Sequence, residues 1–186
     1  MKIEYETRLL DADVSAFIKK LNEAGARFES DDLQIRNCYD FKPVRKNSWI
    51  RLRSNGKVCT LTIKEIESQS VDGTKESEII VSDFKTTDEI LNKLGFKARS
   101  VQENRRIKYS LNNVEIDIDF WPLIPPFVEI EASSKKEIEN TCKLLKIDIK
   151  NLVNIDITKI YEKYGIKNVE KIAKLTLENF KKNIKI

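Results

Sequence analysis

The sequence predicts a single α+β domain whose strands form a mainly antiparallel sheet or a closed barrel. Three observations predict this class. About eight segments alternate apolar and polar residues with the period of two that is typical of strands. Helical segments lie at the start, in the middle and at the end of the series. The length of 186 residues suits one ordinary domain and is short for two.

The first predicted elements are a strand over residues 3–10 and a helix over residues 14–24, with Asp13 as its N-cap and Gly25 at its end. The pair Asn55-Gly56 is a strong signal for a tight hairpin between two strands. Four strands are predicted in this region, over residues 34–41, 49–54, 58–66 and 77–82. The later predicted elements are a helix over 88–94, strands over 100–111, 114–120 and 127–132, and helices over 134–145 and 157–164.

The tail, residues 166–186, differs from the rest of the chain in its charge. It contains six lysines and two glutamates, with apolar Val169, Ile172, Ala173 and Phe180 at helical spacing. This pattern predicts an amphipathic helix that packs on its own domain or on a second subunit, with membrane or nucleic-acid contact as the alternative. We therefore divide the chain into a domain of residues 1–165 and a lysine-rich helix of residues 166–186.

The composition excludes several kinds of catalytic site. The chain has no histidine, which excludes Ser-His-Asp and Cys-His nucleophile systems and histidine-ligated zinc. It has only 5 glycines and neither of the common glycine-rich phosphate-binding motifs. The odd set of Cys38, Cys59 and Cys142 lacks the spacing of a disulfide scaffold or a zinc site, which favours a reducing, cytoplasmic location.

The overall charge gives little indication of a macromolecular partner. The 34 basic and 30 acidic residues give a net charge of +4 and a pI of about 8.8. This is less basic than a dedicated nucleic-acid binder, and the surplus belongs to the tail. No apolar run is long enough to span a membrane. We expect neither a nucleic-acid nor a membrane partner.

Charged side chains repeat along one face of nearly every predicted strand. An open sheet with one solvated face is the ordinary explanation for such alternation. However, charges of one sign recur at every second residue within a strand, and they repel unless an opposite charge lies between them. Divalent cations would balance the carboxylates, and a polyanion would balance the bases. A closed barrel with a polar lumen and helices on its apolar outer face would accommodate both.

Several motifs carry these charges in a fixed order: Glu4-Tyr-Glu6-Thr-Arg8, Trp49-Ile-Arg51-Leu-Arg53, Leu61-Thr-Ile-Lys64, Glu76-Ser-Glu78, Asn104-Arg-Arg106-Ile-Lys108, Asp117-Ile-Asp119 and Glu129-Ile-Glu131. Together they resemble the CYTH superfamily, also called triphosphate tunnel metalloenzymes. That superfamily includes class IV adenylyl cyclases, thiamine triphosphatases and inorganic triphosphatases. The resemblance runs from about residue 3 to residue 164 and excludes only the tail.

The resemblance implies an eight-stranded antiparallel β-barrel, a tunnel with helices outside, that binds a triphosphate together with Mg²⁺ or Mn²⁺. The implied metal ligands are Glu4, Glu6, Asp119, Glu129 and Glu131, with Asp117 as the rival of Asp119. The implied triphosphate-binding residues are Arg8, Arg51, Arg53, Lys64, Arg106 and Lys108, with Glu76 and Glu78 orienting the bases. Arg8 departs from the lysine of the family signature. Alternation alone leaves open which of Arg105, Arg106 and Lys108 faces the lumen.

The expected function is metal-dependent hydrolysis of a triphosphate, with no general base assigned. Cyclisation of ATP is the alternative, and a non-catalytic polyphosphate-binding or nucleotide-binding module is a third reading. A cyclase must hold adenine, and only Tyr39 and Trp49 are candidates to stack on a base. The expected partner is a small molecule that contains a triphosphate, and a homodimer is possible.

Overall fold

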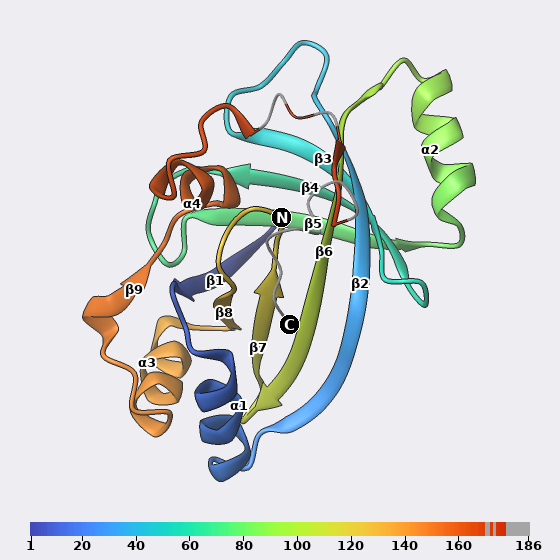
Figure 1. Cartoon of the computed structure of the whole chain (residues 1–186). Coiled ribbons are helices and arrows are strands. Elements are labelled where there is room, and N and C mark those ends of the chain that lie inside the picture. Colours follow the sequence, from blue (N-terminus) through green and yellow to red (C-terminus); the bar gives the residue numbers. More distant parts are fainter. Residues whose placement is uncertain (170–171, 173, 178–186) are drawn as a thin grey trace.

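The structure, a computed structural model, describes residues 1–169, 172 and 174–177. Within these residues, eight strands form a closed antiparallel barrel and four helices pack outside it (Figure 1). The barrel strands are β1 (Lys2–Leu9), β2 (Arg27–Tyr39), β3 (Ser48–Ser54), β4 (Cys59–Ile66), β5 (Thr74–Val81), β6 (Ala98–Leu111), β7 (Val114–Phe120) and β8 (Phe127–Ala132). The helices are α1 (Val14–Glu23), α2 (Phe84–Lys93), α3 (Lys135–Leu144) and α4 (Ile157–Lys163). The predicted fold class is confirmed, and the barrel is the closed one.

Closure of the barrel follows from the strand order. The path runs β6-β2-β3-β4-β5-β1-β8-β7, and β7 then pairs with β6. The β2–β6 pair is long and runs from Arg27 opposite Ser110 to Tyr39 opposite Ala98. Because every barrel strand has two neighbours, one face of the whole sheet encloses a lumen.

Two hairpins show how the local sequence shapes the barrel. Gly56 has a φ of +83° between β3 and β4, and the side-chain oxygen of Asn55 accepts a hydrogen bond from the backbone N–H of Val58 at 2.8 Å. Asn112 and Asn113, at φ values of 50° and 67°, join β6 to β7. Positive φ values at both Asn112 and Asn113 suit the right-handed twist of the flanking strands. Between β3 and β4, Ser54 pairs with Cys59, so the hairpin predicted at Asn55-Gly56 is confirmed, with residues 55–58 as its loop.

Helices α1 and α3 cover the outer face of β6, β7 and β8. Asp13 caps α1 by accepting a hydrogen bond from the backbone N–H of Ala16 at 3.0 Å, as predicted. Phe17 and Leu21 of α1 and Ile138 of α3 then pack against the outward side chains of these strands in one apolar cluster. None of the described helices is both long and apolar enough to cross a lipid bilayer.

Helices α2 and α4 lie elsewhere on the barrel. Leu91 of α2 packs against Tyr39 and Leu52 on the outer side of β2 and β3. Ile160 and Tyr161 of α4 pack with Trp121 at one end of the barrel. The short strand β9 (Leu152–Val153) precedes α4 and pairs with the end of β1.

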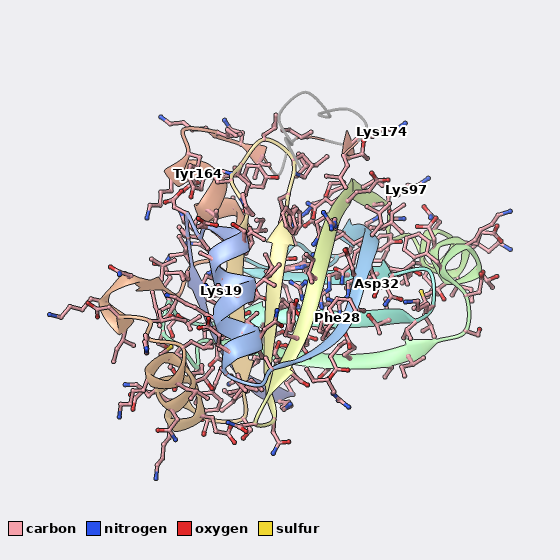
Figure 2. The ribbon with its side chains drawn as sticks, turned by 60° about the horizontal axis from the view of Figure 1, so that its bottom comes forward. Lys19, Phe28, Asp32, Lys97, Tyr164 and Lys174 are labelled. Atoms are coloured by element: carbon pink, nitrogen blue, oxygen red, sulfur yellow. The ribbon has the colours of Figure 1, made fainter. Side chains whose placement is uncertain are left out.

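The predicted C-terminal helix is wrong for residues 174–175. Lys174–Leu175 form strand β10, which runs parallel to β6 and pairs with Val101 and Gln102. Leu175 is buried in the same cluster as α4, so tertiary packing and strand pairing prevail over the helical spacing. Tyr164 and Lys174 lie at the same end of the barrel (Figure 2). The rest of that prediction, including Ala173 and residues 178–186, lies largely outside the described residues.

Candidate functional site

The inner face of the barrel has a basic half and an acidic half. The basic half lies on the adjacent strands β6, β2, β3 and β4 and carries Arg106, Lys108, Arg36, Arg51, Arg53 and Lys64. The acidic half lies on the adjacent strands β5, β1, β8 and β7 and carries Glu76, Glu78, Glu4, Glu6, Glu131, Glu129, Asp119, Asp117 and Glu115. Arg8 projects from the acidic half. The closed sheet thus brings together charges that are scattered along the sequence.

Arg8 is buried between two carboxylates. Its Nη2 lies 2.8 Å from Glu6 and 2.6 Å from Glu129, and its Nη1 donates to the carbonyl of Ile155 at 2.8 Å. Burial alone would raise the pKa of Glu129, but the charges of Arg8 and Arg106 outweigh it and hold that pKa well below its usual range. Glu129 is therefore a fixed negative charge inside the lumen.

Arg106 faces the lumen, and Arg105 faces outward. The Nε of Arg106 donates to Asp119 at 2.8 Å, and its two other nitrogens reach Asp117, Asp119 and Glu129. Arg105 instead binds Asp31 on the outside with two hydrogen bonds of 2.8 Å. Of the two adjacent arginines that alternation left open, Arg106 is therefore the one that faces the lumen. Asp117 and Asp119 both contact Arg106, so the structure brings both candidates for the fifth metal ligand to the same arginine.

Lys64 and Arg51 face carboxylates of the acidic half. The Nζ of Lys64 lies 2.9 Å from Glu4 and 3.5 Å from Glu76, and the Nη2 of Arg51 lies 3.4 Å from Glu76. The Nη2 of Arg53 lies 3.5 Å from Glu78. Glu76 and Glu78 thus contact bases, as the predicted orienting role requires, although the role itself stays a prediction.

The acidic half has the donor atoms that Mg²⁺ and Mn²⁺ prefer. Burial raises the pKa of Glu131 to about 7, and the nearby charges of Glu4, Glu129 and Glu115 act in the same direction. One carboxylate oxygen of Asp117 is buried without a hydrogen-bond partner. Both groups would be stabilised by a cation, so the residues fit a divalent metal by chemistry. Among the residues described, however, no three acidic, histidine or cysteine side chains are already gathered as a metal site.

A cavity of about 380 Å³ occupies one end of the lumen. Of the predicted residues it is lined by Glu6, Arg8, Arg51, Lys64, Arg106, Asp119 and Glu129. Its lining does not include Glu4, Arg53, Glu76, Glu78, Lys108, Glu131 or Asp117. Residues of α4 and β10, together with Trp49 and Trp121, form its outer wall. The predicted metal-binding, triphosphate-binding and orienting residues therefore share one lumen, but only half of them line this cavity.

Lys108 lies apart from the other predicted bases. Its ammonium group pairs with Glu115, and the two side chains are 33% and 41% exposed. The pair is therefore nearer to solvent than the ion pairs of Arg8 and Arg106. In those ion pairs the side chains of the arginines and of their carboxylate partners are 12% exposed or less. Lys108 is the predicted triphosphate-binding residue with the weakest structural support.

Arg36 is a lumen residue that the sequence analysis missed. It is 7% exposed, lines the cavity, and lies with its guanidinium 4.6 Å from the centre of the Trp121 ring. Alternation on β2 separates Gln34, Arg36 and Cys38 from Ile35, Asn37 and Tyr39, yet both sets mix polar and apolar residues. The pattern therefore could not show which set faces the lumen. The missing signal was the order of the strands, which puts β2 between β3 and β6.

Comparison with known families agrees with this geometry. The sequence matches the model of the CYTH domain over residues 2–175. The chain belongs to the CYTH family. The matched span includes every predicted lumen residue and extends through β10. No protein with a curated function matches this CYTH domain significantly.

Solved structures share the fold at low sequence identity. A conserved hypothetical protein from Pyrococcus furiosus is 24% identical, with a TM-score of 0.71 over 84% of this chain and 99% of that chain. A candidate adenylate cyclase from Vibrio parahaemolyticus is 11% identical, with a TM-score of 0.72 over 87% and 98%. A candidate adenylyl cyclase from Hippeastrum, described as having a dominant triphosphatase activity, is 16% identical, with a TM-score of 0.57 over 92% and 100%. At these identities the likeness concerns the fold alone.

Proposed function

We propose that this CYTH domain hydrolyses a triphosphate substrate in the barrel lumen with the help of a divalent metal ion. The observation that carries the proposal is the division of the lumen into a basic half and an acidic half. A substrate with several phosphates would lie along the basic half, and a cation would lie between the phosphates and the acidic half. Catalysis of phosphoryl transfer depends mainly on such positioning and charge.

The basic half is suited to an anion with several charges. Arg51 and Arg53 lie on the same strand face, two residues apart. Burial, together with the charges of Arg51 and Arg106, lowers the pKa of Arg53 to about 10, so Arg53 remains charged at neutral pH beside these two arginines. Their mutual repulsion would be relieved by a bound polyphosphate. Guanidinium groups also match phosphate oxygens with paired hydrogen bonds.

In the acidic half, Glu4, Glu6, Asp119, Glu129 and Glu131 would hold Mg²⁺ or Mn²⁺, with Asp117 as the rival of Asp119. When bound, such an ion neutralises phosphate charge and makes a coordinated water more acidic. The acids and bases are paired with one another across the lumen. A phosphate group can accept the hydrogen bonds that Arg8 donates to Glu6 and Glu129, and those carboxylates would then be available to a cation. Substrate and cation would in this way assist each other's binding.

Water and a ribose hydroxyl are the two possible nucleophiles. Tyr39 is fully buried outside the lumen and donates its hydroxyl hydrogen to Asp88 of α2, so it cannot stack on a substrate base. Trp49 does line the cavity. This position favours a substrate with an organic group and supports ATP cyclisation as the second candidate function. Arg8 stays protonated and cannot act as a base, so a non-catalytic module remains the third reading.

One assay separates these functions. The purified protein is incubated with tripolyphosphate, ATP or thiamine triphosphate, first with Mg²⁺ and then with Mn²⁺, while phosphate and cyclic AMP are measured. We expect metal-dependent release of phosphate that Glu129→Gln abolishes. Cyclic AMP as the main product would refute the hydrolase proposal. Tight binding without any product would support the non-catalytic module.

A further inference from the structure

Arg36 is a buried cation that forms no ion pair with a carboxylate of the described residues; the charge of Asp119 acts on it only from outside ion-pair distance. Its Nη2 donates to the amide oxygens of Gln34, at 2.8 Å, and Asn104. By contrast, Arg8 contacts two carboxylates and Arg106 contacts three. A buried charge that lacks an ionic partner is costly, and proteins seldom keep one without a use for it.

The neighbours of Arg36 add to this cost. In the β2–β3 register its Cα lies directly opposite that of Arg53. Burial lowers the pKa of Arg36, and the charges of Arg51, Arg53 and Arg106 bring it to about 9, although the charge of Asp119 acts in the opposite direction. The side chain is thus still cationic at neutral pH. Like charges directly opposite each other on a sheet are destabilising unless an anion lies between them.

The guanidinium of Arg36 is nevertheless held in a fixed position. It lies over the Trp121 ring, and Trp121 packs edge-on against Tyr161 with 6.5 Å between the ring centres. The hydroxyl of Tyr161 in turn donates to the carbonyl of Pro122 at 2.7 Å. The Nε of Arg36 is buried and has no hydrogen-bond partner in the described part of the chain. A guanidinium has five N–H donors, and donors remain unused here.

Arg105, the outward-facing arginine of β6, shows how this chain stabilises an arginine with a structural role. It also stacks on an aromatic ring, at 5.1 Å from the centre of Phe120, but it binds the carboxylate of Asp31 with two hydrogen bonds. Arg36 has the aromatic support without the carboxylate. Its missing partner is therefore an anion that enters the cavity which Arg36 lines.

We propose that Arg36 binds a phosphate group of the substrate, as an additional phosphate-binding residue beyond those that the family resemblance implies. Its place on β2 fills the gap between the bases of β3 and those of β6. The phosphate path then runs without interruption over the four strands of the basic half. This inference rests on the proposed function, because it takes the polyanion to be a triphosphate.

The test compares Arg36→Met with the matched control Arg105→Met in the full chain. Tripolyphosphate is the probe, in EDTA so that no metal-dependent turnover occurs. Its Kd is measured by calorimetry and the melting temperature by circular dichroism. We expect Arg36→Met to weaken the Kd by at least about tenfold, as loss of a charge-assisted hydrogen bond implies. It should also melt at or above the temperature of the unmodified protein without ligand, because it removes an uncompensated buried charge.

Arg105→Met should leave the Kd unchanged. If Arg36 had a merely structural role, its substitution would lower the melting temperature and leave the Kd unaltered, and that result for Arg36→Met would overturn the inference.

If Arg36→Met does not fold, Arg36→Lys decides instead. It keeps the charge but not the planar set of donors, so an unaltered Kd would again overturn the inference. If the unmodified protein neither binds tripolyphosphate in EDTA nor hydrolyses it with Mg²⁺ or Mn²⁺, the proposed function fails and the role of Arg36 fails with it. If it hydrolyses tripolyphosphate but binds it too weakly in EDTA to measure, KM takes the place of the Kd in the comparison of the variants. Binding that survives loss of the guanidinium overturns the role of Arg36 alone.

Discussion

Glu129 is the most informative single position in the lumen, and Glu129→Gln is the substitution that tests it. The change keeps the size of the side chain and removes its charge. The Nη2 of Arg8 lies 2.6 Å from Glu129, and the Nη2 of Arg106 donates to it at 3.2 Å. Both arginines would remain buried after the change, each with fewer negative charges around it.

The size of the effect follows from what each arginine retains. Removing one partner of an isolated buried ion pair costs about 3–5 kcal/mol. Here Arg8 keeps Glu6 at 2.8 Å, and Arg106 keeps Asp117 and Asp119. Hydrogen bonds to a charged acceptor are roughly twice as strong as neutral ones, and the glutamine oxygen can still accept one. We therefore expect the free energy of unfolding to fall by about 2–3 kcal/mol.

Urea unfolding followed by tryptophan fluorescence measures this loss, and Glu115→Gln is the matched control. Glu115 also pairs with a base, Lys108, but its side chain is 41% exposed, so its loss should cost less than about 1 kcal/mol. Glu129→Gln should also abolish metal-dependent release of phosphate. Equal stability of the two variants would refute the assignment of Glu129 as a buried, paired charge. Full turnover by Glu129→Gln would refute its place in the metal site.

Three further predictions concern other parts of the molecule. Arg8→Lys restores the family's lysine but loses the 2.8 Å bond to the carbonyl of Ile155, so urea unfolding should show a loss of about 1–2 kcal/mol. Trp49→Ala should raise KM for ATP by about tenfold, the effect of losing a stacked ring, and leave KM for tripolyphosphate unchanged. Equal effects on both substrates would show that Trp49 does not contact an organic group. Asp13→Ala removes the cap that accepts from Ala16, and thermal unfolding should reveal a loss of about 1 kcal/mol with no change in turnover.

The sequence predicted best those strands whose alternation is uninterrupted. The predicted spans 114–120 and 127–132 coincide with β7 and β8, because each has an apolar face under helices and a charged face in the lumen. By contrast, β2 begins at Arg27 rather than at residue 34. Several residues of its first half are exposed, and pairing with the backbone of β6 holds this half in place. Such pairing leaves no local pattern in the sequence.

The same limit applies to the site. Arg106 could be proposed as a lumen residue from the basic residues on its strand, although alternation alone left Arg105 open, and the contacts of Arg106 with Asp117 and Asp119 show that it lies inside. Arg36 could not, because its role depends on the two strands between which β2 lies and on the Trp121 ring behind it. At Lys174–Leu175 the sequence instead suggested an element that did not form. The helical spacing predicted a helix, but pairing with β6 makes these residues a strand. Features that arise from contacts between distant segments were the ones that periodicity did not reveal.

The long pairing of β2 with β6 also has a kinetic consequence. The two strands are far apart in the chain, with the strands β3, β4 and β5 and the helix α2 between them, so their association closes a large loop at an entropic cost. Until they pair, Arg36 and Arg106 are not brought onto one wall. A folding intermediate that has formed only the local hairpins, such as β3–β4, would contain secondary structure but no complete phosphate path. The ability to bind a polyphosphate should therefore appear late in folding, together with closure of the barrel.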